Sequence, residues 1–242
     1  MIPLFLLEDL ADPLPDVGTS VRLDGEEGRH AALVRRIRPG ETILIGDGRG
    51  RAVAGRVDEV SKTALTIRVA EQLVEVRPWR HYVAVQALPK GDRGELAVEM
   101  MTEVGVAEII PWQASRSVVR WSGDRGEKAL HRWRSTAREA AKQSRRLVVP
   151  AVREPIDTSE LVQAVGAVDC ALILHEEATE PLAGVHLPEH GTVMIVIGPE
   201  GGIAPAEIDE LVAAGGLPVS ISDGVLRTST AGVVALATVM SR

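Results

Sequence analysis

A glycine-rich loop with a carboxylate inside it, Gly198-Pro199-Glu200-Gly201-Gly202, is the stretch whose residues are best suited to hold a ligand. It follows the apolar run Val193–Ile197, which is typical of a buried parallel strand, and it precedes Pro205, a residue favoured in the first turn of a helix. The amides of such a loop normally attract phosphate, but the carboxylate of Glu200 would repel it. The loop therefore favours a ligand that lacks phosphate and carries positive charge.

S-adenosylmethionine meets this description, because it combines an adenosine, a sulfonium and an amino acid. The two common nucleotide-binding fingerprints, GxGxxG and GxxxxGK[ST], are both missing from the sequence. On composition alone, an ordinary tight connection between a strand and a helix explains the glycine loop equally well. The six histidines are scattered and there is no CxxC or HExxH, so no metal site is predicted.

Two further segments should lie beside this loop, because each follows a predicted strand. They are His175-Glu176 and Ser222–Thr230. Alternating strands and helices after residue 80 predict an α/β domain with a mostly parallel sheet and with ligand sites at the carboxyl ends of its strands. We expect the three segments to line one pocket. The predicted strands are His81–Ala87, Glu108–Trp112, Asp169–Leu174, Val193–Ile197 and Val219–Ser222, and the predicted helices are Gly94–Val104, Gly126–Leu147, Ala231–Met240 and one from Pro205 with Ile208, Leu211 and Val212 on one face.

The first seventy residues have the pattern of a small β-rich domain. Asp47-Gly48-Arg49-Gly50 is a hairpin signal between two of its predicted strands. Mixed charge and Pro78 place a domain boundary within Glu71–Arg80, giving domains 1–72 and 73–242. The predicted elements are strands Thr19–Leu23, Thr42–Ile45, Arg51–Val57 and Ala64–Val69 with a helix Gly25–Ile37, an arrangement that indicates a small barrel.

Length and composition agree with an intracellular protein of one or two domains. The chain has 242 residues and one cysteine, Cys170, which excludes an internal disulfide framework and fits a reducing compartment. No basic leader is present at the N-terminus, and no apolar run approaches the ~20 residues needed to cross a bilayer. We expect a soluble cytoplasmic protein without a membrane partner.

The net charge of -7 conceals a basic segment. Residues 113–150 contain ten Lys/Arg against three Asp/Glu, whereas residues 151–242 contain three against thirteen. In the helix of this segment, Leu130, Trp133, Ala137, Ala140 and Ala141 recur at helical spacing and should face the core, while Arg132, Arg134, Arg138, Lys142, Arg145 and Arg146 occupy much of the remainder. A charged outer face is the usual explanation of such a pattern, but the scarcity of acids here favours RNA binding.

Several motifs, in order and at matching spacing, resemble the SPOUT class of methyltransferases, and in particular the family that methylates N3 of a uridine in 16S ribosomal RNA. The likeness covers nearly the whole chain and is weakest before residue 28. The motifs are Ile197–Gly202, Val225–Ala231, Ala87–Arg93 with Glu103–Val106 and Arg116-Ser117, and Arg132-Trp133 with Glu139–Arg146 and Pro150.

This resemblance implies a SPOUT-type parallel sheet with a C-terminal trefoil knot over residues 73–242 and a PUA-like RNA-binding β-barrel over residues 1–72. It also implies a homodimer, S-adenosylmethionine as cofactor and methyl donor, and 16S ribosomal RNA or the 30S subunit as partner. Two alternatives stay open. One is a SPOUT enzyme acting on another RNA, such as a transfer RNA ribose 2′-hydroxyl; the other is a non-catalytic RNA-binding factor of ribosome assembly.

We predict Arg227 as the cation that stabilises the deprotonated uridine, with a structural salt bridge as its alternative role, and Glu200 as a possible base. The predicted cofactor-binding residues are Leu174, His175, Ile197, Gly198, Pro199, Glu200, Gly201, Gly202, Ile221, Ser222, Val225, Leu226, Ser229 and Thr230. The predicted RNA-binding residues are Arg29, His30, Arg35, Arg36, Arg116, Arg120, Arg138, Gln143, Arg145 and Arg146. Three residues depart from the family pattern: Ser222 replaces a glycine, Met100 a lysine, and Ser229 a glutamate.

Overall fold

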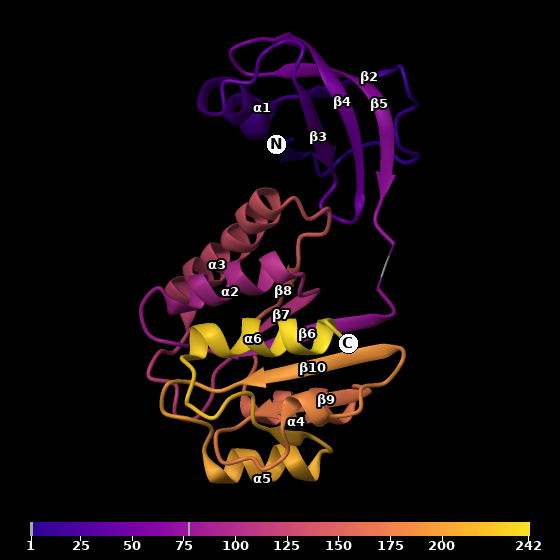
Figure 1. Ribbon diagram of the computed structural model, residues 1–242. Coiled ribbons are helices and arrows are strands. Elements are labelled where there is room, and N and C mark those ends of the chain that lie inside the picture. Colours follow the sequence, from indigo (N-terminus) through magenta and orange to yellow (C-terminus); the bar gives the residue numbers. More distant parts are fainter. Residues whose placement is uncertain (1, 77) are drawn as a thin grey trace. The chain divides into compact units, whose positions relative to one another are not determined.

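The computed structural model describes residues 2–76 and 78–242, which form two compact units (Figure 1). Unit 1 contains the described residues up to 76 together with Ala141–Val149, and unit 2 contains Pro78–Ala140 and Pro150–Arg242. In the described ranges, no helix is both long enough and apolar enough to span a membrane.

Unit 1 is built on a curled five-stranded sheet with the order β1-β3-β4-β5-β2 (Figure 1). Its strands are β1 (Leu4–Leu6), β2 (Ser20–Leu23), β3 (Thr42–Gly46), β4 (Arg51–Val60) and β5 (Leu65–Val74). The β1–β3 pair is parallel and the other pairs are antiparallel. The four strands predicted in this region are confirmed. Strand β1 was not predicted, because its three residues are all buried and show no alternation.

The helical segment of unit 1 differs from the single helix predicted for Gly25–Ile37. Helix α1 (Gly25–Arg29) passes into a π-helical turn, His30–Val34, and Arg36 then adopts a φ of 53°. The prediction of one regular helix was therefore wrong beyond Arg29. A run of apolar residues at helical spacing does not distinguish an α-helical turn from a π-helical one.

Lys142 corrects a second prediction. It was expected on the exposed face of the basic helix, but its Nζ lies 2.8 Å from Glu27 Oε1 within unit 1, and the two side chains are only 8% and 13% exposed. A buried ion pair of this kind joins α1 to the end of the long helix, so Lys142 is not available to bind RNA.

Unit 2 is an α/β domain around a six-stranded sheet, order β11-β9-β10-β6-β7-β8, in which every pair is parallel. The strands are β6 (Arg80–Ala87), β7 (Glu108–Trp112), β8 (Ala151–Val152), β9 (Cys170–Leu174), β10 (Gly191–Ile197) and β11 (Leu217–Val219). The helices are α2 (Arg93–Val104), α3 (Gly123–Ser144, of which the residues from Ala141 on belong to unit 1), α4 (Thr158–Gly166), α5 (Pro205–Ala213) and α6 (Thr228–Met240), with a short 3₁₀ turn at Leu182–Gly184.

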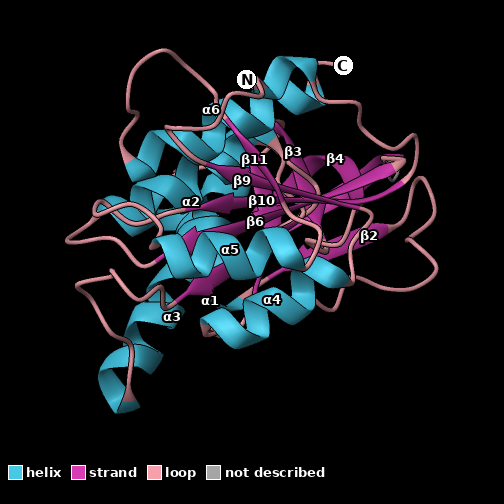
Figure 2. Cartoon of the chain, turned by 90° about the horizontal axis from the view of Figure 1, so that it is seen from below, coloured by secondary structure: helices cyan, strands magenta, loops and turns pink. Residues whose placement is uncertain are grey.

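Helices cover both faces of this sheet (Figure 1). Helices α4 and α5 lie side by side on one face, as the view from below in Figure 2 shows, and their Leu161 and Leu211 pack against Val85 and Val196 of the sheet. Helices α2 and α6 cover the opposite face. Burial on both faces explains why the buried stretches Val83–Ala87 of β6 and Val193–Ile197 of β10 are apolar; Gln86 is the exception in them and is completely buried.

The strands and helices predicted for this region were mostly confirmed, including the five core positions of α3, all of which are buried. Strand β8 and helix α4 were not predicted. The strand expected at Val219–Ser222 was wrong in its bounds, because β11 covers Leu217–Val219. Val212 was expected to face the core with Ile208 and Leu211, but it is 43% exposed.

Candidate functional site

A pocket of about 310 Å³ lies at the carboxyl ends of β9, β10 and β11 in unit 2. The three segments predicted to converge do so, and together they form most of this strand-end pocket. Its lining residues are Arg93, Leu174, His175, Glu176, Ile197, Gly198, Pro199, Glu200, Gly202, Ile203, Ser220, Ile221, Ser222, Gly224, Val225, Leu226, Arg227, Thr228 and Ala231. The volume lies at the lower end of the range for small-molecule sites.

The glycine loop after β10 needs its glycines for two separate reasons. At Gly198, an added Cβ would lie 2.8 Å from the side chain of Ile203, so the backbone could not approach so closely with any other residue. Gly202 has a φ of +70°, in the left-handed region that non-glycine residues avoid. The loop therefore has a specific backbone shape that depends on glycine at these two positions.

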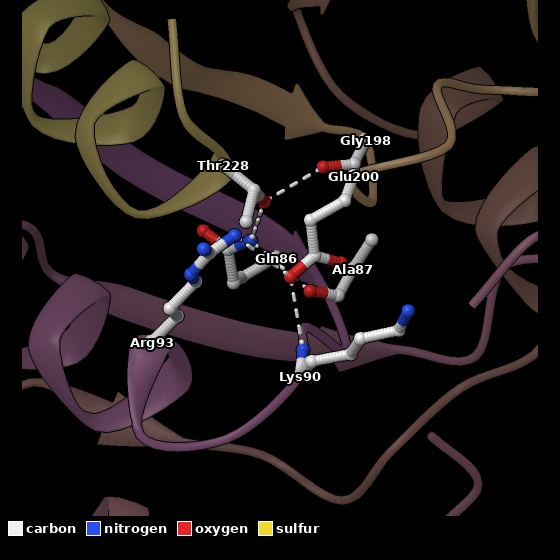
Figure 3. A network of polar contacts seen from close by, with 7 residues as sticks. All are labelled: Gln86, Ala87, Lys90, Arg93, Gly198, Glu200 and Thr228. Atoms are coloured by element: carbon white, nitrogen blue, oxygen red, sulfur yellow. Dashed lines mark hydrogen bonds and ion pairs between the residues drawn. The ribbon is translucent and has the colours of Figure 1, made fainter. Parts of the chain in front are cut away.

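A buried polar chain fixes this loop against the start of α6 (Figure 3). Gln86 Nε2 donates to Thr228 Oγ1 over 2.9 Å, and Thr228 Oγ1 donates to the carbonyl oxygen of Gly198 over 2.8 Å. The same Gln86 nitrogen also donates to the Ala87 carbonyl at 3.0 Å. Because these groups come from β6, the β10 loop and α6, they fix the positions of these three elements relative to one another.

Glu200 ties the loop to the turn before α2 (Figure 3). Its Oε1 accepts a hydrogen bond from the backbone N–H of Lys90 at 3.0 Å and lies 3.4 Å from Arg93 Nη1. Arg93 thereby reaches the pocket wall, a position that sequence reasoning missed although Arg93 lies in a motif that carried the family resemblance. The carboxylate predicted as a base thus also has a positioning role, and Oε1 is the oxygen engaged in it.

Arg227 lines the same pocket but makes no ion pair within the described part of the chain, and its side chain is exposed. The structural salt bridge that was the alternative for this residue is therefore not present. Its backbone carbonyl accepts from the N–H groups of Thr230 and Ala231 and so starts α6. The backbone of Arg227 is held by these hydrogen bonds, while its guanidinium is free to pair with a negatively charged group of a ligand.

The segment after β7 contacts both the glycine loop and helix α5. Arg116 Nη1 donates to the Gly201 carbonyl at 3.1 Å. The neighbouring Ser115 is held by Glu207 of α5, whose Oε1 accepts from the Ser115 N–H and whose Oε2 accepts from its hydroxyl, each at 2.8 Å. Although burial acts to raise the pKa of Glu207, hydrogen bonds from Ser115, Thr158 and Ala204 outweigh it and hold that pKa below its usual value.

Most of the predicted cofactor residues line the strand-end pocket, and three do not. The carbonyl of Gly201 accepts from Arg116, Ser229 is buried in the first turn of α6, and Thr230 follows it in the same turn. Ser222, where the family has glycine, closes a turn by donating from Oγ to the Gly224 carbonyl and accepting from the Gly224 N–H. The lining residues Glu176, Ile203, Ser220, Gly224, Thr228 and Ala231 were not among the predicted cofactor residues.

The predicted RNA-binding residues fall into both units. Arg116, Arg120 and Arg138 belong to unit 2, where Arg120 donates to the carbonyls of Gln113 and Ser115. The others belong to unit 1: Arg29, His30, Arg35, Arg36, Gln143, Arg145 and Arg146. The ring of His30 packs edge-on against Phe5 at 6.2 Å between centroids, so part of its surface belongs to the core of unit 1.

Gln86 was missed as well. A single glutamine in an apolar strand gives no indication of its partners, and its contacts with Thr228 span 142 residues. Over residues 2–76 and 78–242, no group of three or more His, Cys, Asp or Glu side chains is placed to hold a metal ion.

Comparison with known proteins identifies the family. Residues 77–240 match an RNA methyltransferase domain, and residues 23–70 match an RNA methyltransferase PUA domain. The chain belongs to this RNA methyltransferase family. Two relatives carry the name ribosomal RNA small subunit methyltransferase E. That of Mycobacterium bovis is 47% identical over 94% of this chain and 88% of its own length, and that of Bacillus subtilis is 33% identical over 90% and 88%.

The same family includes a solved structure with the same fold. The ribosomal RNA small subunit methyltransferase E of Neisseria gonorrhoeae, crystallised with S-adenosyl methionine, is 27% identical and superposes with a TM-score of 0.86. The superposition covers 100% of this chain and 98% of the other. Family membership and fold therefore agree over the full length of the chain.

Proposed function

We propose that this protein transfers a methyl group from S-adenosylmethionine to N3 of a uridine in 16S ribosomal RNA. Methylation of ribosomal RNA that depends on S-adenosylmethionine follows from the family and from relatives named for it. The choice of uridine N3 rests on the motifs of the strand-end pocket and on Arg227, the exposed cation on its wall. That unpaired guanidinium beside a glycine loop is the observation that carries the proposal.

The strand-end pocket fits the cofactor by its chemistry. Its walls combine apolar side chains such as Leu174 and Ile197 with main-chain groups that can read the edge of an adenine. Charges of both signs are present in the lining, with Glu176 and Glu200 as the acidic residues and Arg93 and Arg227 as the basic residues. A ligand that carries a sulfonium, an ammonium and a carboxylate requires such a mixed lining. When bound, S-adenosylmethionine supplies an electrophilic methyl group.

The protein must make the acceptor nitrogen nucleophilic. Uridine N3 is protonated at neutral pH, so its proton has to leave and the resulting negative charge, spread over the ring oxygens, has to be stabilised. Arg227 is proposed for this stabilisation and Glu200 remains the proposed base. With Oε1 of Glu200 engaged by Lys90 and Arg93, Oε2 is the oxygen proposed to accept the proton.

Binding of the RNA is proposed to use both units. The cations proposed to contact phosphate are Arg29, Arg35, Arg36, Arg116, Arg120, Arg138, Arg145 and Arg146, with His30 and Gln143 as further polar contacts. Phosphate contacts would supply affinity that falls with increasing salt. Residues 1–72 are proposed as the PUA-like RNA-binding barrel and residues 73–242 as the methyltransferase domain.

Three further properties complete the proposal. The first is a trefoil knot in the C-terminal segments, in agreement with the backbone bonds by which the Glu180–Leu182 segment meets Ser220 beside β11. The second is a homodimer. The third is a cytoplasmic location, where ribosomal RNA would be available.

Methylation of 30S subunits and of free 16S ribosomal RNA, side by side with labelled S-adenosylmethionine, tests this function. Digestion to nucleosides and mass spectrometry should reveal 3-methyluridine. A ribose-methylated nucleoside instead would move the acceptor to a 2′-hydroxyl. Absence of cofactor binding by calorimetry would indicate a non-catalytic RNA-binding factor.

A further inference from the structure

A second cavity, of about 230 Å³, lies in unit 2 beside the turn that supports the glycine loop. Its floor contains two indole rings, Trp121 and Trp133, packed edge to face with centroids 4.9 Å apart. We name it the tryptophan cavity. It is lined by Pro89, Gly91, Gly94, Glu95, Val119, Trp121, Ala129, Arg132 and Trp133.

The tryptophan cavity and the strand-end pocket share one short turn. Gly91 and Gly94 line the cavity, whereas Arg93 between them lines the pocket, and Lys90 of the same turn donates to Glu200. An added Cβ at Gly94 would lie 2.6 Å from the ring of Trp133, so the turn is packed directly on this ring. A ligand in the cavity would therefore lie next to a ligand in the pocket.

The polar groups of the cavity suit the edge of a planar heterocycle. Glu95 offers a carboxylate, whose Oε1 accepts from Arg132 Nε at 3.0 Å and which is 27% exposed. The indole Nε1 of Trp133 is packed against Gly94, 2.8 Å from the position that an added Cβ would take there, and Trp133 is only 2% exposed. The carboxylate acceptor of Glu95 and the exposed guanidinium donor of Arg132, beside aromatic rings, form a combination that binds an unstacked nucleobase.

The segment that supplies Val119, Trp121, Ala129, Arg132 and Trp133 to the cavity is basic. Residues 116–134 contain six Lys/Arg against two Asp/Glu, and all six cationic residues are exposed. They are Arg116, Arg120, Arg125, Lys128, Arg132 and Arg134. A basic segment of this kind attracts the phosphates of a nucleic acid, while the aromatic walls of the cavity accept a base.

We propose that the tryptophan cavity holds one unstacked base of the ribosomal RNA, from a nucleotide next to the uridine that is methylated. This proposal rests on the proposed function, because it places the acceptor uridine in the strand-end pocket. The size agrees: about 230 Å³ corresponds to roughly eight water molecules at ~30 Å³ each, and a pyrimidine base has a similar number of non-hydrogen atoms. Anchoring a neighbouring base fixes the register of the RNA at the methyl donor.

Three variants test the proposal. Trp121→Leu removes an aromatic wall, Ala129→Leu fills the cavity from helix α3 without removing any polar group, and Trp121→Phe is the conservative control. Methyl transfer to 16S ribosomal RNA, calorimetric binding of S-adenosylmethionine and the thermal midpoint are measured for each. Loss of one stacked base predicts a KM for RNA raised about tenfold or more in the two Leu variants, with cofactor affinity unchanged. Trp121→Phe should stay within about threefold of wild type.

A measurement on the wild-type protein tests the proposal even if the variants do not fold. Addition of a short uridine-rich oligoribonucleotide should shift the indole N–H NMR signals of Trp121 and Trp133 and leave that of Trp112, which is buried in β7, in place. Folded Leu variants with an unchanged KM for RNA, or indole signals that do not respond to the oligonucleotide, overturn the proposal. A wild-type protein that binds cofactor but methylates no ribosomal RNA overturns the proposed function itself.

Discussion

The hydroxyl of Thr228 donates to the carbonyl oxygen of Gly198 over 2.8 Å, joining the first turn of α6 to the glycine loop. Both residues line the strand-end pocket. The same hydroxyl accepts from Gln86, which is completely buried. One threonine oxygen therefore determines how two walls of the pocket meet, and its removal leaves the Gln86 amide without one of its acceptors.

Thr228→Val should weaken cofactor binding and lower stability together. Valine has nearly the shape of threonine but cannot pair with Gln86 or Gly198, so the free energy of unfolding should fall by about 1–3 kcal/mol. Loss of about 1 kcal/mol at the pocket raises the Kd of S-adenosylmethionine roughly fivefold. Calorimetry and denaturant unfolding measure the two effects. Thr228→Ser, which retains the hydroxyl, is the matched control, and equal affinities for all three proteins would contradict this role.

Arg227→Ala should lower kcat while leaving cofactor affinity close to that of the wild type. The guanidinium has no carboxylate partner to release among the described residues, so its loss should not unsettle the fold. Removal of one group that stabilises developing negative charge typically reduces kcat by about 10²–10³-fold. Single-turnover methyl transfer measures it. Arg227→Lys should recover part of the rate, and undiminished turnover in the Ala variant would exclude the assigned role.

The two last glycines of the loop should respond differently to alanine. Gly202 has a φ of +70°, where a Cβ costs about 1–2 kcal/mol, whereas an added Cβ at Gly201 meets nothing closer than 3.6 Å. Gly202→Ala should therefore lower the thermal midpoint and weaken cofactor binding, and Gly201→Ala should change neither appreciably. If the two variants behave alike, the loop does not depend on the left-handed residue.

Local sequence patterns predicted the parts of unit 2 that are regular. The apolar run Val193–Ile197 and the segment Glu108–Trp112 appear as strands β10 and β7, because residues of a parallel strand covered on both faces must all be apolar. The convergence of the strand-end segments followed from the rule that parallel strands end at one edge of a sheet.

Contacts between distant residues could not be predicted in this way. Glu200 pairs with Arg93 across 107 residues, and Gln86 with Thr228 across 142. The residues that flank each member of these pairs in the sequence do not indicate which distant residue it contacts. For Lys142 the prediction was made and was wrong. Its position on the helix indicated an exposed cation, but it forms a buried ion pair with Glu27 of the same unit. Contacts between residues far apart in the sequence determine whether such a side chain is exposed or buried, and helix propensity and periodicity contain no information about these contacts.

Glu207 should make the stability of unit 2 depend on pH. Its carboxylate accepts four hydrogen bonds, from the N–H and hydroxyl of Ser115, the hydroxyl of Thr158 and the N–H of Ala204. These outweigh burial and hold its pKa in the folded protein below the usual 4.5. The stabilisation is therefore complete above pH 4.5 and is lost as the pH falls through the folded-state pKa.

Glu207→Gln tests this directly. A neutral amide presents N–H groups to donors and cannot accept all four hydrogen bonds, so at pH 7 the free energy of unfolding should fall by about 1–3 kcal/mol. The difference from wild type should shrink below pH 4.5, because protonation disables the wild-type carboxyl as well. Urea unfolding at pH 7 and at acidic pH measures both quantities. Glu210→Gln, an exposed site on the same helix, is the control, and a stability gap that stays constant with pH would refute the assignment to Glu207.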